Sequence, residues 1–198
     1  MKVSWPRNWP EAGRQALVKY SLLGVLGMAA AGASLIVAPG FAGYAGAALA
    51  LTMLAIAVID WRLLIIPDEL NALAFVLGIA DISVEGWSEM PAPALSAAAR
   101  CAAMAAIFLV FRLAYRRLRR REGMGLGDVK LAGVAGIWLD WTSLPIAVEI
   151  AALSALAFVL SQRMFARQSA DHETKWPFGA FLAPSIWICW ILARLQGL

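Results

Sequence analysis

Two aspartates stand where the chain passes between apolar and polar sequence. Asp60 ends the apolar run LTMLAIAVID, and Asp128 follows three glycines in GMGLGDVKL, directly after the most basic stretch of the chain. An ionisable side chain at membrane depth is costly and is a functional candidate by default. When two carboxyl groups approach closely, one keeps its proton while the other accepts a proton from a water between them. The pair therefore has the residue types of aspartic protease chemistry, with water as the nucleophile.

Glycine and proline mark the backbone beside both acids. Gly125 and Gly127 permit a positive φ and close backbone approach, which a simple loop does not require. At membrane depth, non-helical backbone is tolerated where it is buried in protein or lines a water-filled cavity. Pro67 follows Asp60 and favours a sharp re-entry, with the proline near the first turn of the next helix. The sequence therefore predicts a shaped site near both acids.

Two charged residues flank this candidate site. Asp68 suits the positive end of the helix expected after Pro67, so helix capping explains it. Lys130 has three interpretations: it favours the ionised form of Asp128, it contacts a substrate, or it extends to the membrane interface. Asp128 is expected to begin a helix and Asp60 to end one. The helix macrodipole then predicts an ionised Asp128 and a protonated Asp60 in the resting protein.

Other catalytic and ligand-binding chemistries find little support. His172 is the only histidine and lies in a polar loop, which argues against Ser/His/Asp and Cys/His arrangements. Cys101 and Cys189 are isolated within apolar runs, so we expect packing residues and not a disulfide or a zinc site. We expect no metal and no cofactor. A non-enzymatic alternative stays open, in which Asp60 and Asp128 couple a small transporter or an assembly scaffold to protons or ions.

The composition predicts a membrane protein. Of the 198 residues, 62% are hydrophobic and only 15% are charged, against roughly 25% charged residues in soluble domains. Apolar runs of about 20 residues, long enough for a helix to cross a bilayer, recur along the chain. We therefore predict one all-α polytopic membrane domain over residues 1–198. Its seven expected transmembrane helices lie near residues 17–38, 42–60, 66–83, 94–114, 128–140, 143–161 and 177–195, the fifth of them short.

Basic residues alternate between the connections of these helices. They occur in the amino-terminal segment, residues 1–16, and in the second, fourth and sixth connections, most densely at residues 112–121. The positive-inside rule places the amino terminus and both aspartates on the cytoplasmic side. Topology and contact with anionic membrane lipids explain the net charge of +4 without a nucleic-acid partner. The first residues lack the features of a cleavable secretory signal, so the first apolar run is expected to be a retained anchor. Arg194, near the outer end, is expected to extend to the headgroups.

Three stretches carry a resemblance: DWRLLIIPDEL from Asp60, GMGLGDVKLAGVAGIWL around Asp128, and WPFGAFLAP from Trp176. From residue 42 to its carboxyl end the chain resembles the type IV prepilin peptidases, which belong to the GxGD class of membrane aspartic proteases. The resemblance implies that Asp60 and Asp128 are the catalytic pair. It implies that Gly125 and Gly127 shape the loop that presents Asp128. It also implies cleavage of prepilins or pseudopilins after a glycine that ends a short basic leader, at the cytoplasmic face of the bacterial inner membrane.

The sequence departs from this family pattern in its cysteine motifs. Longer bacterial members carry an amino-terminal cytoplasmic domain with paired CxxC motifs, which is linked to N-methylation of the new amino terminus. This sequence contains neither CxxC pair, so we expect a peptidase-only form without methyltransferase activity. A presenilin-like protease is an alternative that shares GxGD. Its companion motif for the first aspartate is YD, whereas Ile59 precedes Asp60 here.

Overall fold

Seven α-helices make up the part of the chain that the computed structural model describes, residues 9–85, 91–119, 124–165 and 176–197, where no strand occurs. They are α1 (Trp9–Val37), α2 (Phe41–Leu63), α3 (Asp68–Glu85), α4 (Ala92–Arg119), α5 (Leu126–Trp138), α6 (Ser143–Phe165) and α7 (Gly179–Leu195). Each matches one of the expected helices, with ends that differ by a few residues. The largest difference is at α1, which begins at Trp9 and not near residue 17. The expected all-α fold is confirmed over these residues.

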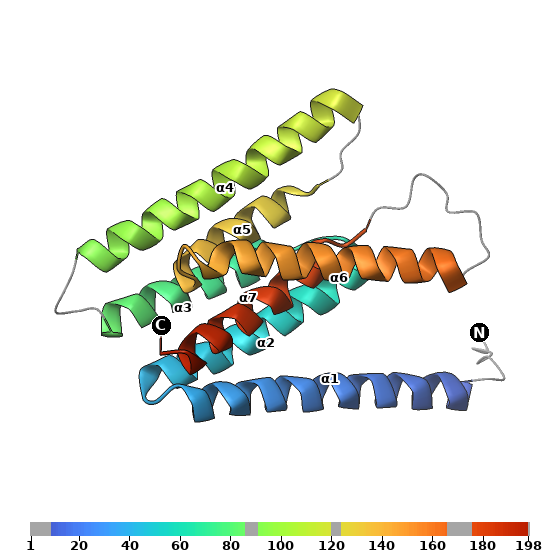
Figure 1. Ribbon diagram of the computed structural model, residues 1–198. Helices are drawn as coiled ribbons and strands as arrows, with labels where there is room; N and C mark the ends of the chain where they lie inside the picture. Colours follow the sequence, from blue (N-terminus) through green and yellow to red (C-terminus); the bar gives the residue numbers. More distant parts are fainter. Residues whose placement is uncertain (1–8, 86–90, 120–123, 166–175, 198) are drawn as a thin grey trace, which may run out of the picture.

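Successive helices run in opposite directions along the bundle. The C-terminal ends of α2, α4 and α6 therefore lie at the same end as the N-terminal ends of α3, α5 and α7 (Figure 1). The N-terminal end of α1 lies at this end too, whereas the carboxyl end of α7 lies at the other (Figure 1). Asp60 and Asp128, at the end of α2 and the start of α5, are thus brought to one end of the molecule.

Three of the described helices are long and apolar enough to cross a membrane: Phe41–Leu63, Ala92–Leu118 and Ser143–Met164. The segment Ser21–Val37 of α1 and the helix α7 are apolar but shorter. Large apolar side chains are exposed along several helices, including Ile36 of α1 and Phe111 of α4. Such a surface suits lipid better than water. Length, composition and surface together indicate an all-α membrane protein.

Glycines allow the helices of the bundle to approach closely. A Cβ at Gly46 of α2 would overlap the indole ring of Trp190 on α7, so the central α2–α7 pair needs glycine there. A Cβ at Gly136 of α5 would likewise overlap the backbone of α4 at Cys101. Small residues at helix interfaces let backbones pack together, which is how helices associate in lipid. These two contacts fix α7 on α2 and α4 on α5.

Buried polar side chains link the helices at the end away from the aspartates. Arg194 of α7 forms an ion pair with Asp81 of α3 at 3.1 Å, and its guanidinium lies 5.6 Å from the ring centre of Trp190. The expectation that Arg194 simply extends to the headgroups was therefore wrong, because a buried acid on α3 binds it. Nearby, Trp138 of α5 donates its indole N–H to the carbonyl of Ala74 at 2.9 Å. These contacts tie α3 to both α5 and α7.

Candidate active site

A pocket of about 750 Å³ opens where α2 ends and where α3 and α5 begin. Both Asp60 and Asp128 line it. The rest of its wall comes from the α2–α3 connection, from residues 124–127 and from residues 176–178, directly before α7. The structure thus brings the two aspartates of the sequence analysis into one pocket, together with the five neighbouring residues singled out there, Pro67, Asp68, Gly125, Gly127 and Lys130.

Asp60 is held at the junction of two helices. Its backbone carbonyl accepts the N–H of Leu64 at 2.9 Å, which closes the last turn of α2. Its carboxyl Oδ2 accepts the backbone N–H of Ala180 at 2.8 Å, in the first turn of α7. The side chain is only 5% exposed. Asp60 therefore ends α2 with its backbone and caps the amino-terminal end of α7 with its carboxyl group.

The contact with α7 depends on Gly179. A Cβ at this position would lie 2.9 Å from Oδ2 of Asp60 and would also press on the side chain of Ile66. Any side chain would therefore push α7 away from the Asp60 carboxyl group. Gly179 stands in the stretch WPFGAFLAP, but its role could not be predicted, because nothing in the sequence shows that α7 meets α2 there.

Asp128 lies in the first turn of α5 and is 8% exposed. Its Oδ2 accepts the backbone N–H of Gly125, the N-cap residue, at 3.0 Å. Its Oδ1 is buried and has no hydrogen-bond partner among the described residues. One oxygen thus orients the carboxyl group, while the other stays available to a ligand in the pocket.

Of the described glycines before Asp128, Gly127 allows close backbone approach, and neither Gly125 nor Gly127 has a positive φ. Gly125 has extended backbone with φ −72° and ψ 160°, and among the described glycines only Gly40 and Gly197 have a positive φ. Of the two possibilities that the glycines opened, a positive φ is therefore not used at Gly125 or Gly127. A Cβ at Gly127 would lie 2.8 Å from Cβ of Ile66, so glycine lets this segment pack on the α2–α3 connection. Gly123 lies outside the described residues.

The two carboxyl groups are neighbours. Both line the same pocket, and the charge of Asp60 acts on Asp128. Each is also fixed by an N–H at a helix start, Asp60 at α7 and Asp128 at α5. From the sequence, only the C-terminal end of α2 was expected to act on Asp60, and the prediction of a protonated Asp60 beside an ionised Asp128 depended on that. Because the start of α7 offsets that effect, helix dipoles no longer distinguish the two acids.

Lys130 and Asp68 form an ion pair at the rim of the pocket. Lys130 Nζ lies 2.7 Å from both carboxyl oxygens of Asp68, and both side chains are exposed. The pair joins the first turns of α3 and α5. The ammonium group of Lys130 binds Asp68 and not Asp128. The structure therefore supports none of the three interpretations of Lys130 made from the sequence. Pro67 directly precedes α3, and its carbonyl accepts the N–H of Asn71 at 3.2 Å, as a residue at a helix start does.

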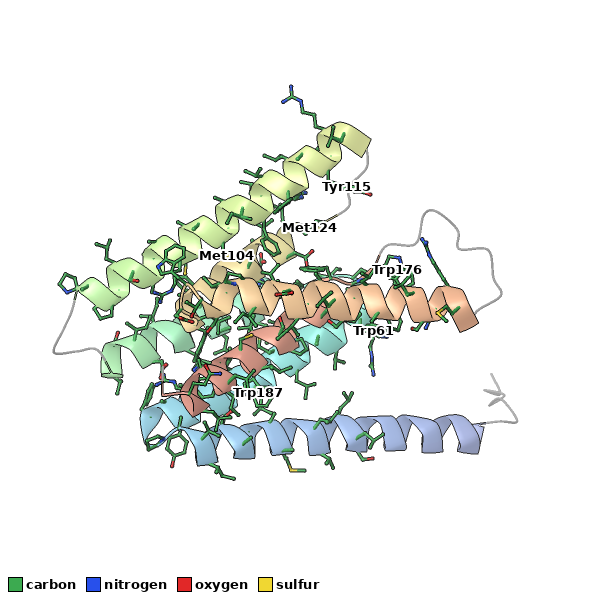
Figure 2. All side chains as sticks on the ribbon, in the orientation of Figure 1. Trp61, Met104, Tyr115, Met124, Trp176 and Trp187 are labelled. Atoms are coloured by element: carbon green, nitrogen blue, oxygen red, sulfur yellow. The ribbon has the colours of Figure 1, made fainter. Side chains whose placement is uncertain are left out.

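Two further features support the site, and the sequence analysis did not foresee them. Arg112 of α4 donates its Nε–H to the carbonyl of Met124 at 3.0 Å, which anchors the segment that leads to Asp128. A cluster of aromatic rings also packs α6 against α2 and α7 next to Asp60: Trp61, Phe158, Trp176 and Phe181, with ring centres 4.9–6.0 Å apart. Trp61 and Trp176 are seen beside α6 (Figure 2). Both features require tertiary contacts that no local motif encodes.

The cysteines and the histidine considered in the sequence analysis do not line this pocket where the structure describes them. Cys101 and Cys189 are free cysteines on α4 and α7. Glu149 is a further acidic residue within an apolar helix, α6; it is exposed and does not line the pocket. His172 lies outside the described residues. Among residues 9–85, 91–119, 124–165 and 176–197, no cluster of histidine, cysteine or acidic side chains could hold a metal ion.

Comparisons with known proteins agree on one family. Residues 47–160 match the model of the type IV leader peptidase family. A prepilin leader peptidase/N-methyltransferase of Stutzerimonas stutzeri is 32% identical over 151 residues, 75% of this chain and 50% of that protein. The proteins of that name from Aeromonas hydrophila and Pectobacterium carotovorum are each 30% identical over 90% of this chain, and the matches cover 58% and 63% of their lengths.

The matched part of the relatives is limited. This chain spans about half to two thirds of the length of these curated relatives. No solved structure gives a significant match. The family match includes both aspartates of the pocket, most of α2, and the helices α3, α4 and α5. On this match, the chain belongs to the type IV leader peptidase family.

Proposed function

We propose that this protein is a prepilin leader peptidase that cleaves type IV prepilins or pseudopilins after a glycine, at the cytoplasmic face of the bacterial inner membrane. The observation that carries the proposal is the pair of buried carboxyl groups, Asp60 and Asp128, in one pocket. Family membership supports it, and so do the printed names of the relatives. The proposal covers the peptidase activity in those names and not the methyl transfer.

The proposed mechanism is that of an aspartic protease. The carboxylate of one aspartate takes a proton from a water between the two acids, and the water oxygen attacks the scissile carbonyl carbon. The protonated carboxyl group of the other aspartate donates to the developing oxyanion. Collapse of the tetrahedral intermediate breaks the C–N bond, and the leaving amine receives the proton that the first aspartate took from the water. The N–H groups of Ala180 and Gly125 hold the two carboxyl groups in place throughout.

We propose seven membrane crossings with a cytoplasmic amino terminus, which would place the pocket at the cytoplasmic face. The alternating helix directions place the start of α1 and the aspartates at one end (Figure 1). The arginine-rich end of α4 lies at this end as well. Under the positive-inside rule this end faces the cytoplasm. The basic leader of a prepilin would then stay in water beside the pocket, while its apolar stem enters the bilayer among the lipids.

The test is cleavage of a purified prepilin by the detergent-solubilised protein, with the new amino terminus identified by mass spectrometry. Asp60→Asn and Asp128→Asn should each abolish cleavage while the protein stays folded and membrane-inserted. Glu149→Gln is the matched control, since Glu149 is exposed on α6 outside the pocket, and it should cleave normally. Cleavage by either aspartate variant would exclude the mechanism. A folded wild-type protein without cleavage would favour the ion-coupled transporter or scaffold.

A further inference from the structure

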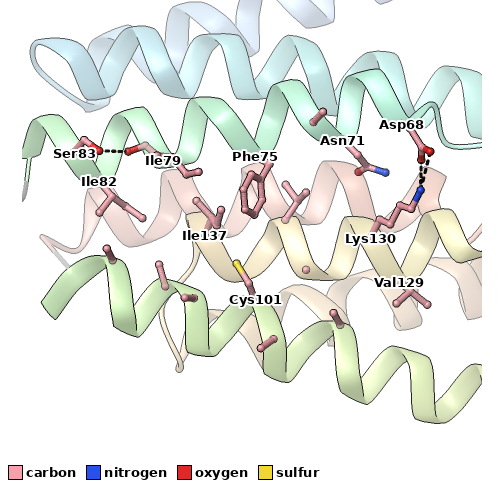
Figure 3. Close-up of a pocket in the computed structure, with 18 residues that line it drawn as sticks. Asp68, Asn71, Phe75, Ile79, Ile82, Ser83, Cys101, Val129, Lys130 and Ile137 are labelled. Carbon is pink, nitrogen blue, oxygen red and sulfur yellow. Dashed lines mark hydrogen bonds and ion pairs between the residues drawn. The ribbon is translucent and has the colours of Figure 1, made fainter. Parts of the chain in front are cut away.

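A second cavity, of about 870 Å³, adjoins the candidate active site. It is a groove between α3 and α4 with α5 as its floor (Figure 3). Its α3 side carries large apolar residues such as Phe75 and Ile79, and its α4 side is mostly alanine. Asp68 and Lys130 line both this groove and the pocket of the aspartates. The Asp68–Lys130 ion pair therefore lies at the boundary between the two cavities.

One buried polar side chain in this groove has no partner. Asn71 of α3 is 4% exposed, and neither its Nδ2 nor its Oδ1 has a hydrogen-bond partner among the described residues. Its amide extends from α3 towards α5, between Phe75 and the Asp68–Lys130 pair (Figure 3). Leaving a buried donor and acceptor unpaired destabilises the protein, because neither group recovers the hydrogen bonds it made with water. A ligand in the groove that supplies both a donor and an acceptor would recover this cost.

The chemistry of Asn71 selects the kind of ligand. A lipid acyl chain would fill an apolar groove but offers no hydrogen bond to the amide. A regular α-helix has few free backbone groups to bind the amide, because its N–H and C=O groups are hydrogen-bonded within the helix. An extended polypeptide exposes a free N–H and a free C=O at each residue, and the carboxamide of asparagine matches this pair with its own acceptor and donors.

We propose that this groove binds the stretch of substrate next to the scissile bond in extended form, and that Asn71 hydrogen-bonds its main chain. The inference rests on the proposed function and adds a substrate-binding site to it. The scissile bond lies between the aspartates, and the extended chain passes the Asp68–Lys130 pair into the groove. Apolar side chains of the substrate pack against Phe75 and the alanines of α4.

Replacing Asn71 separates a binding role from a structural one. Asn71→Leu keeps the size of the side chain and removes its hydrogen bonds. We expect kcat/KM for prepilin cleavage to fall about tenfold or more, mainly through KM. The thermal midpoint should be unchanged or higher, because an unpaired buried amide is removed. A structural role would instead lower the thermal midpoint, and normal cleavage by this variant would overturn the proposal.

Filling the groove from α4 gives a second test. Ala102 and Ala99 are both exposed on α4, but only Ala102 lines the groove. Ala102→Trp should therefore block cleavage of a prepilin, and Ala99→Trp should not. Equal cleavage by the two variants would mean that substrate does not enter the groove, as expected for a groove that holds only lipid.

Cys101 allows the occupant to be trapped directly. This free cysteine lines the groove, whereas Cys189 is buried in the core. In the Asp128→Asn variant, a prepilin with one cysteine placed a few residues after the cleavage site should form a disulfide with Cys101 under mild oxidation. No such cross-link at any position of the stem would overturn the proposal. A cross-link in a protein whose wild type does not cleave would keep the groove assignment and reject the proposed function.

Discussion

At the scale of single residues, each candidate catalytic carboxyl group is oriented by a backbone N–H. Asp60 accepts from Ala180 and Asp128 accepts from Gly125. A carboxyl group fixed in this way loses part of its rotational freedom before a substrate arrives, which is how pre-organised sites reduce the cost of reaching the transition state. The glycine at the start of α7 makes the first of these contacts possible, so it belongs to the site as much as the glycines before Asp128.

Gly179→Ala should impair cleavage without unfolding the protein. The added Cβ would lie 2.9 Å from Oδ2 of Asp60, so either α7 or the carboxyl group must shift. We expect kcat for prepilin cleavage to fall about 100-fold, the order of loss that a displacement of about 1 Å produces in an active site. Gly32→Ala is the matched control, because a Cβ at Gly32 meets nothing within 4 Å. Wild-type rates for Gly179→Ala would show that Asp60 does not depend on this contact.

At the scale of elements, α4 reaches across to the segment that leads to Asp128. The Arg112 side chain binds the carbonyl of Met124 at 3.0 Å. Arg112→Leu should therefore loosen this segment and lower kcat/KM for cleavage by about tenfold or more. Arg116→Leu removes the same charge from an exposed position one turn further along α4 and should leave cleavage nearly unchanged. Equal losses in both variants would mean that charge alone matters.

Asp140 stabilises the start of α6 at the opposite end of the bundle. Its carboxyl oxygens accept the backbone N–H groups of Ser143 at 3.0 Å and Thr142 at 3.3 Å. Partial burial acts to raise the pKa of Asp140, but hydrogen bonds from Ser143 and Thr142 outweigh it and lower the pKa to about 2. Because the pKa is lowered on folding, the carboxylate stabilises the fold fully at pH values above its ordinary pKa of 3.8. This stabilisation is lost as the pH falls towards 2.

Asp140→Ala should therefore lower the free energy of unfolding at pH 7 by about 0.5–2 kcal/mol, the usual cost of removing a helix cap. As pH falls from about 4 to 2 the difference between this variant and the wild type should shrink, because the wild-type carboxyl group becomes protonated over this range. Unfolding in detergent micelles at pH 7, 4 and 2 measures both effects. Asp140→Asn is the control, since its amide oxygen keeps a capping acceptor that does not titrate. A stability difference independent of pH would contradict the capping role.

At the scale of the whole molecule, the helices could be predicted from the sequence because apolar runs of membrane length are a strong signal. The pairing of Asp60 with Asp128 could also be predicted, since helix alternation brings both to one end. The role of Gly179, the contact of Arg112 with Met124 and the unpaired amide of Asn71 could not. Each depends on which helix lies against which, and the spacing of residues along one chain does not encode that.

The orientation of the bundle gives the last prediction. The proposed function requires the end that carries the aspartates to face the cytoplasm, where a prepilin leader is present. Arg116 lies at this end, on the basic part of α4, and Trp141 lies at the other end, between α5 and α6; both side chains are exposed. In a background with Cys101→Ser and Cys189→Ala, a cysteine replacing Arg116 should react with an impermeant thiol reagent only in inside-out membrane vesicles. A cysteine replacing Trp141 should react only in right-side-out vesicles. The reverse pattern would place the pocket on the periplasmic side, away from the leader, and the proposed function would fail with it.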